Sequence, residues 1–318
     1  MRFAVLLLLL APFFAVAQTV PFLETSLELV TIPSAPRAGE TVTVRAVNIS
    51  APGNTTFVWR VNGSVVDQGL GVSAITITTR ALGIPTTVSV SAFENGQAKA
   101  EKSITITPSE IDLVWEGNTY TPPLFEGLPR PNPSSSVTFL AVPGIVSFGQ
   151  RVPAGSLVYT WYVNGSQFPL VSGYGKSSIT IKPPQFLNPF TVRVVAETGD
   201  GSVRTEAQTE VKPIRPQIVI YEKAALLGYR FDRAVGGALQ LEGDEVTLTA
   251  FPLFVNSLRA PTYSWSINGS AVSDTEDEGK EITLRKTGEG RGAFSLSFSL
   301  ENAAALFEKA SAAFLLTF

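Results

Sequence analysis

The chain has 318 residues, of which 44% are hydrophobic and only 16% are charged. It contains no His and no Cys, which excludes a Ser-His-Asp or Cys-His catalytic unit, a His- or Cys-ligated metal site and any disulfide. The formal net charge is −3, and no run of Lys or Arg is present, so the composition argues against nucleic acid or an anionic membrane as a partner.

Residues 1–17, MRFAVLLLLLAPFFAVA, have the features of a signal peptide: one basic residue, an apolar run and Ala15-Val16-Ala17 before Gln18. We predict cleavage before Gln18 and therefore an exported protein, at the cell surface or outside the cell. The apolar run is short for a membrane span of ~20 residues. No later run is longer, so no transmembrane segment is expected after cleavage.

A motif of Trp, a two-residue gap and Asn-Gly-Ser occurs three times. Its tryptophans, Trp59, Trp161 and Trp265, are 102 and 104 residues apart, which indicates one β-unit used three times. Alternating apolar and polar residues lead into Asn-Gly, a dipeptide suited to a type I′ turn, so each motif predicts a hairpin whose Trp points into a core.

The strands expected around these hairpins follow the same order in each repeat. In repeat 1 they are 40–47, 74–79 and 87–93; in repeat 2 they are 135–142, 177–182 and 190–197; in repeat 3 they are 244–251, 280–286 and 293–302. Seven or so short strands with frequent turns predict a sandwich of two sheets.

A buried Trp on the third strand, at a spacing near that of one domain, resembles the immunoglobulin-like sandwich. The chain looks similar to the bacterial immunoglobulin-like and PKD-like modules of surface proteins, over nearly all of residues 24–318, although it lacks the inter-sheet cysteine pair of antibody domains. The resemblance implies an all-β fold of three tandem immunoglobulin-like sandwiches. It implies no particular activity.

The predicted domains are 18–108, 109–214 and 215–318. The joints between them contain Pro108, and Pro213 with Pro216, and short proline linkers are semi-rigid. We therefore expect the three sandwiches to form an extended rod, on the order of 100 Å long from ~3.3 Å per strand residue.

Two long insertions between the first and second strands distinguish repeats 2 and 3 from repeat 1. They cover 114–133 and 220–237, and a common spacing of 106 residues predicts that Trp115 is equivalent to Tyr221 and Glu116 to Glu222. Such carboxylates in separate domains are not expected to share an active site, and no catalytic residue or cofactor is predicted.

Large aromatic side chains in these insertions are the candidate partner-binding residues, because rings in long loops either fill a cleft or present a surface. They are Trp115, Tyr120, Phe125, Tyr221, Tyr229 and Phe231. In an immunoglobulin-like topology the repeat 2 insertion should face repeat 3 and support that joint. The repeat 3 insertion has no following domain in the chain, so it is the better candidate for a partner.

An acidic loop, 274–278, contains four carboxylates in five residues. Oxygen-rich loops of this kind sometimes hold Ca²⁺, but the spaced Asp/Asn-Gly pattern is missing, and a solvated run of charge explains it as well. No metal is predicted.

The sequence favours a non-enzymatic exported protein that acts by binding a protein, or as a subunit of a cell-envelope assembly such as a pilus or a surface layer. Two alternatives remain open. One is an adhesin-like free binder, whose target is a host or neighbouring surface. The other is an accessory module that binds a glycan, which requires Trp115 or Tyr221 to face solvent.

Overall fold

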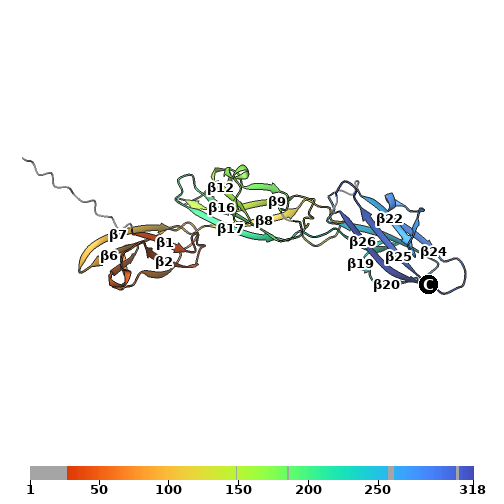
Figure 1. Ribbon diagram of the computed structural model, residues 1–318, viewed down its shortest axis with the longest axis horizontal. Coiled ribbons are helices and arrows are strands. Elements are labelled where there is room, and N and C mark those ends of the chain that lie inside the picture. The colour runs from red at the N-terminus through yellow and green to blue at the C-terminus, as the bar shows by residue number, and fades with distance from the viewer. Residues whose placement is uncertain (1–26, 148, 185, 257–260, 306–307) are drawn as a thin grey trace, which may run out of the picture. The chain divides into compact units, whose positions relative to one another are not determined.

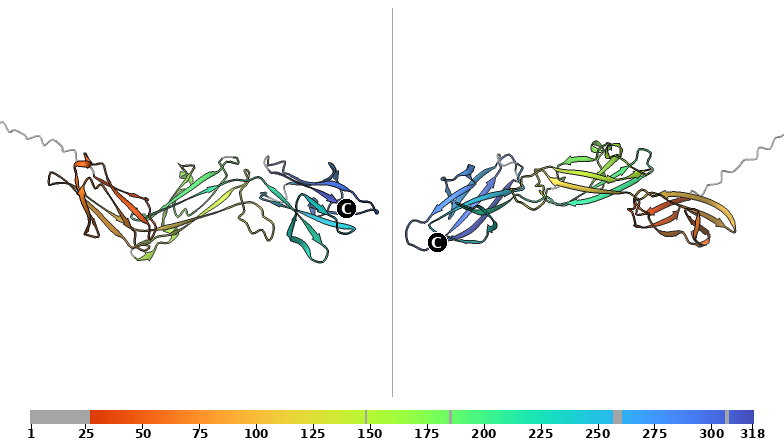
Figure 2. Two further views of the ribbon diagram at one scale, coloured as in Figure 1. Left: turned by 90° about the horizontal axis from the view of Figure 1, so that it is seen from below. Right: turned by 180° about the vertical axis from the view of Figure 1, so that it is seen from behind.

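The computed structural model describes residues 27–147, 149–184, 186–256, 261–305 and 308–318, so the predicted signal peptide at 1–17 lies outside the described residues. Within these ranges the chain forms β-strands joined by turns, and its only helical segments are single 3-10 turns. Figure 2 shows the strands of each repeat arranged in two layers. The predicted all-β class, with tandem immunoglobulin-like sandwiches, is confirmed.

Repeat 1 forms two sheets with the strand orders β1-β2-β5 and β4-β3-β6-β7 (Figure 1). The separation of the first, second and fifth strands from the others is the immunoglobulin-like arrangement. The elements are β1 (Glu28–Ile32), β2 (Thr41–Val47), η1 (Pro52–Asn54), β3 (Thr56–Val61), β4 (Ser64–Leu70), β5 (Ala74–Thr78), β6 (Thr86–Glu94) and β7 (Gln97–Ile106).

Repeat 2 has the same pair of sheets, ordered β15-β9-β8 and β13-β12-β16-β17, with β14 also pairing with β12 and a separate β10-β11 ladder. The elements are β8 (Glu110–Gly117), β9 (Val137–Gly144), β10 (Val146–Ser147), β11 (Gln150–Arg151), η2 (Ala154–Ser156), β12 (Val158–Val163), β13 (Ser166–Gln167), η3 (Pro169–Val171), β14 (Gly173–Tyr174), β15 (Ser178–Ile181), β16 (Phe190–Glu197) and β17 (Arg204–Val211).

Repeat 3 adds one strand to each sheet, giving the orders β19-β18-β21-β24 and β20-β26-β25-β22-β23. Strand β20 pairs in parallel with the C-terminal strand β26. The elements are β18 (Gln217–Ala224), β19 (Gly228–Val235), β20 (Ala238–Gln240), β21 (Glu245–Leu253), β22 (Thr262–Ile267), β23 (Ser270–Val272), η4 (Asp277–Gly279), β24 (Glu281–Arg285), β25 (Ala293–Glu301) and β26 (Lys309–Thr317).

The three motif tryptophans are fully buried in their sandwiches. Trp59 Nε1 donates to Val72 O at 2.7 Å, and Trp161 Nε1 donates to Lys176 O at 2.8 Å. Trp265 Nε1 is buried and has no acceptor among the described residues. The same side chain therefore fills each core, but only the first two rings are also held by a hydrogen bond.

The Asn-Gly turn after each Trp has the geometry that the dipeptide predicts. Asn62 and Gly63 have φ values of 48° and 85°, and the other two turns repeat this pair of positive angles, as a type I′ turn requires. Each Asn also bonds the neighbouring strand twice. Thr87 N donates to Asn62 Oδ1 at 3.0 Å, while Asn62 N donates to Thr87 O at 2.8 Å. Asn164 with Thr191, and Asn268 with Ser295, make the same two bonds.

The repeat 3 insertion is a strand hairpin, so its interpretation as a long loop is wrong. Residues 228–235 form β19, which pairs with β18 and leaves only 225–227 between them. In YRFDRAV the aromatic and charged residues alternate, and the two rings pack on one face of the sheet. That alternation is the strand signal.

The predicted register between the two insertions is also wrong, by one residue. Trp115 pairs with Phe139, whereas Tyr221 pairs with Thr249 and Glu222 pairs with Leu248. Phe139 and Leu248 are both buried in their cores, so Trp115 corresponds to Glu222. Because successive side chains of a strand alternate between faces, Trp115 faces inward while Tyr221 faces outward.

The described residues form two compact units. The first unit consists of the described residues up to Thr31, together with residues 43–77 and 87–105. The second unit consists of residues 32–42, 78–86 and 106–318, and so contains repeats 2 and 3. The predicted domain boundaries at 108/109 and 214/215, and the extended rod, stay predictions.

Candidate functional site

Four aromatic side chains gather on the outward face of the β19-β18-β21-β24 sheet of repeat 3. They are Tyr221 on β18, Tyr229 and Phe231 on β19, and Phe251 on β21, and we call them the ring cluster. The centroid of the Phe251 ring lies 5.7, 5.1 and 5.5 Å from those of Tyr221, Tyr229 and Phe231. The contacts are edge-to-face or tilted, which is the favoured geometry for aromatic pairs.

The ring cluster attaches β19 to the sheet and is itself half covered. Tyr221, Phe231 and Phe251 are partly buried, and Tyr229 is 38% exposed. The rings mostly bury one another, so a first consequence is structural: they hold the added edge strand in place. Tyr229 is the most exposed of the four rings.

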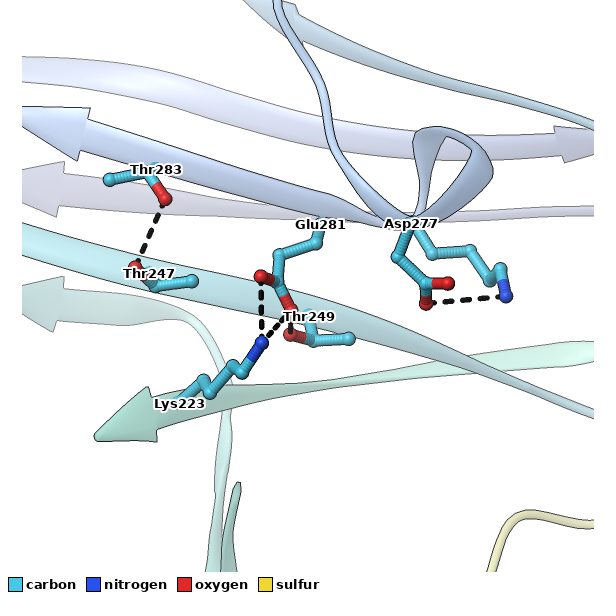
Figure 3. Close-up of polar contacts among 7 residues, drawn as sticks. Lys223, Thr247, Thr249, Asp277, Glu281 and Thr283 are labelled. Atoms are coloured by element: carbon cyan, nitrogen blue, oxygen red, sulfur yellow. Dashed lines mark hydrogen bonds and ion pairs between the residues drawn. The ribbon is translucent and has the colours of Figure 1, made fainter. Parts of the chain in front are cut away.

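A partly buried ion pair lies beside the ring cluster, with the Lys223 ammonium 5.7 Å from the centroid of the Tyr229 ring; Figure 3 shows the pair itself. Lys223 Nζ donates to Glu281 Oε1 at 2.9 Å and Oε2 at 3.0 Å, and Thr249 Oγ1 donates to Oε2 at 2.8 Å. The Glu281 side chain is 6% exposed and that of Lys223 is 40% exposed. The hydrogen bond to Glu281 raises the pKa of the Lys223 ammonium above its ordinary value. Together with Thr249, this pair joins β18, β21 and β24 across the sheet.

Two leucines form the tip of the β18–β19 hairpin. Leu226 is 97% exposed and Leu227 is 84% exposed. Neither leucine contributes to the repeat 3 core. We call 225–228 the hairpin tip. Single exposed leucines are common, but two in sequence at the end of a projecting hairpin form a small apolar surface that water does not favour.

A polar cavity of about 320 Å³ lies at the inner side of the same hairpin. Its charged lining includes Glu222, Arg230, Arg233 and Glu242. Arg230 also pairs with Asp232 at 3.3 Å. The mixture of both signs favours neither a simple anion nor a cation.

The repeat 2 candidates lie in two different places. Trp115 is in strand β8, not in a loop, and packs against the core of repeat 2. Tyr120 and Phe125 lie against repeat 3. Tyr120 N donates to Val255 O at 2.7 Å, Phe254 N donates to Tyr120 O at 2.7 Å, and the rings of Phe125 and Phe254 are 5.6 Å apart. These contacts agree with the expectation that this insertion supports the joint with repeat 3.

The acidic loop 274–278 contacts its own surroundings. Asp277 pairs with Lys280 at 3.3 Å, and Glu276 bridges Glu281 through the backbone. Burial, followed by the nearby charge of Glu278, raises the pKa of Tyr263 to about 12. Among the described residues no group of three acidic, His or Cys side chains is placed to hold a metal ion.

The structure thus brings together three of the six predicted aromatic residues: Tyr221, Tyr229 and Phe231. Sequence reasoning missed Phe251, the Lys223–Glu281 pair and the hairpin tip. Phe251 had a usable signal, because Val246, Leu248 and Ala250 alternate inward along its strand and leave Phe251 outward. The ion pair joins residues 58 positions apart, and no local pattern predicts it.

No protein-family model and no curated protein sequence matches the chain. Solved structures of similar overall pattern include three N-terminal domains of the Hoc capsid protein of bacteriophage RB49, at 13% identity and a TM-score of 0.25, covering 92% of this chain and 97% of that one. The central fibronectin-III array of RIM-binding protein has 14% identity, a TM-score of 0.31 and coverage of 91% and 94%.

A third similar structure is SGBP-B of the mixed-linkage glucan utilization locus of Bacteroides ovatus, determined in complex with a mixed-linkage heptasaccharide. It has 13% identity and a TM-score of 0.24, and the alignment covers 97% of this chain and 69% of that one. At these values the similarities carry no functional argument. No helix among the described residues is both long and apolar enough to span a membrane.

Proposed function

We propose that the protein is an exported, non-enzymatic binding protein, and that it contacts a protein partner of the cell envelope through the β18–β19 hairpin of repeat 3. The observation that carries the proposal is the pair of exposed leucines at the hairpin tip, 97% and 84% exposed. Exposed apolar surface of this kind is typical of contact sites.

The ring cluster and the Lys223–Glu281 pair support this role because they hold the hairpin to the sheet. If the hairpin were flexible, binding a partner would lose conformational entropy as the hairpin became ordered, and this would weaken the affinity. The five ring contacts and the two bonds from Lys223 to Glu281 reduce that cost before the partner arrives. The absence of His and Cys from the chain supports a non-enzymatic role.

Fractionation of the producing cells, with protease shaving of intact cells, tests the proposal. The wild-type chain should stay with the cells and be cut from outside, while Leu226→Ser with Leu227→Ser should move most of it into the medium. Leu170→Ser is the matched control, because Leu170 is 88% exposed but lies in repeat 2. Equal retention of the wild type and the double variant would refute the hairpin as the contact.

Glycan binding is a second candidate because the Tyr229 ring is 38% exposed and the Lys223 ammonium lies 5.7 Å from its centroid. An aromatic ring with nearby charged side chains is able to stack on a sugar and hydrogen-bond its hydroxyls. Binding to isolated cell-wall polysaccharide that is lost in Tyr229→Ala, but kept in the double leucine variant, would favour this function over protein binding.

A further inference from the structure

An apolar groove lies along the edge of strand β9 in repeat 2, next to exposed apolar side chains of β8 and β9. Val114, Leu140 and Val142 are 51%, 43% and 44% exposed. Val114 pairs directly with Leu140 across the two strands, so these side chains are neighbours and not scattered single residues.

The groove has a volume of about 510 Å³. One wall is the edge of β9, and the other is formed by residues 151–154. Its lining is mostly apolar and includes Leu140, Val142, Pro143, Val152, Pro153 and Ala154, together with the charged Arg151. A concave apolar surface of this kind suits a small convex apolar segment.

The hairpin tip of repeat 3 is such a segment. Leu226 and Leu227 project from the turn between β18 and β19 and are almost fully exposed, and the groove residues are exposed as well. The tip and the groove of one chain are therefore not covering each other. Either surface is available to another molecule.

Acidic side chains of β8 flank the groove on one side, because Asp112 pairs with the groove residue Val142, while the basic Arg151 is part of the lining. The outward-facing charged side chains of β8 are all acidic: Glu110, Asp112 and Glu116. The hairpin carries three basic and two acidic side chains, and the exposed Arg233 makes no ion pair within the described residues. Complementary charge of this kind favours approach and sets orientation more than it adds affinity.

We propose that the hairpin tip of one copy docks in the repeat 2 groove of a second copy. The inference rests on the proposed function, because it assigns the partner of the same hairpin. Since the two surfaces differ, the contact is heterologous, and a bound pair of copies keeps one free tip and one free groove. Repeated contacts of this type build rings or open filaments. A single contact of this small size is weak. An assembly in which several such contacts form at the same time binds more tightly than one contact alone.

Cysteine cross-linking tests the contact cleanly, because the chain has no cysteine of its own. Leu226→Cys protein is mixed with Leu140→Cys protein under mild oxidation, and disulfide-linked dimers are measured. The control mixture replaces Leu140→Cys by Leu170→Cys, which lies in the same repeat and is 88% exposed. We expect at least about tenfold more heterodimer in the first mixture, since docking raises the effective concentration of the two thiols.

A charge-exchange experiment is an independent test of the same contact. Arg233→Asp in the Leu226→Cys protein should lower the heterodimer yield, and Asp112→Arg in the Leu140→Cys protein should restore it, because the pair would again have opposite charges. Restoration of this kind also shows that both variants are folded. Failure of the second change to restore the yield would contradict the proposed orientation.

The remaining outcomes separate this inference from the proposed function. Equal yields in both mixtures, or a prevailing Leu226→Cys homodimer, would overturn docking of the tip in the groove. The two cross-linking mixtures could give equal yields while the double leucine variant is still released into the medium. In that case the hairpin would bind a partner, but that partner would be another protein. If selective cross-linking occurred while retention was unaffected, self-docking would stand and the retention proposal would fall.

Discussion

Asn132 and Glu308 form a buried hydrogen bond, with 3.0 Å between Nδ2 and Oε1, although they are 176 positions apart in the chain. Both residues are completely buried. Asn132 Nδ2 also donates to Phe254 O at 2.8 Å, and Glu308 accepts from Asn256 N at 2.7 Å and Asn302 Nδ2 at 2.6 Å. One amide of repeat 2 is therefore bonded into a polar network of repeat 3.

Replacement of Asn132 should weaken this network more than an ordinary surface change would. Asn132→Ala leaves the Phe254 carbonyl and one Glu308 oxygen short of a donor, and we expect a loss of about 2–3 kcal/mol in the free energy of unfolding. Urea denaturation measures it. The control is Asn118→Ala, because Asn118 makes its side-chain bonds at the exposed surface. Equal losses in the two variants would contradict the importance of the buried network.

Lys223→Met should destabilise repeat 3 because Glu281 would remain 6% exposed with only Thr249 as its side-chain donor. We expect a loss of about 1–3 kcal/mol, and the double variant Lys223→Met with Glu281→Gln should recover part of it. The pKa of Lys223 is raised by Glu281, so the contribution of the pair is complete below the ordinary lysine pKa of about 10.4. It should be lost as the pH rises through the raised value. No recovery in the double variant would argue against an uncompensated carboxylate.

Asp200 should titrate well below an ordinary aspartate. Thr198 Oγ1 donates to Asp200 Oδ1 at 2.6 Å, and Ser202 donates to it through N at 3.1 Å and Oγ at 2.8 Å. These bonds lower the pKa of Asp200 to about 2. The stabilisation of this turn is therefore present above the ordinary pKa of about 3.9 and is lost as the pH falls towards 2. The carboxyl carbon resonance should show the low midpoint, and Thr198→Val should raise it. A wild-type midpoint near the ordinary value would contradict the bonded turn.

Substituting each motif Trp by Phe should have unequal effects. Trp59→Phe and Trp161→Phe remove a ring and also a donor to a buried carbonyl, whereas Trp265→Phe removes only the ring, because its Nε1 has no acceptor among the described residues. We expect the first two to cost about 1 kcal/mol more than the third. Calorimetric unfolding of the three variants provides the comparison, and three equal costs would show that the indole bonds add nothing.

The strands of the sandwiches were predictable from sequence because alternation is local. Residues 190–197 were predicted as a strand, and β16 has those bounds. The face of Tyr221 was not predictable, because it depends on pairing with Thr249 on a strand far along the chain and on a bulge after Tyr221. An error of one residue in register moves a ring from the solvent to the core.

The candidate site divides in the same way. Tyr229 and Phe231 stand out as large rings in an unusual insertion, so composition was enough to select them. Their contact with Phe251, and the pairing of Lys223 with Glu281, arise only when four strands meet in one sheet. Trp115 was selected on the same grounds as Tyr221, but it packs on the core of repeat 2.

The Asn-Gly turns suggest that the hairpins are exchangeable parts. In all three repeats the Asn binds the adjacent strand through the same two hydrogen bonds, between 2.8 and 3.0 Å long. The attachment depends on one side chain and three backbone groups, and not on the residues that vary around it. A hairpin moved from one repeat to the equivalent place in another therefore brings with it the Asn that binds the adjacent strand. The loops beyond the turn are free to vary in sequence without changes to the sandwich that holds them.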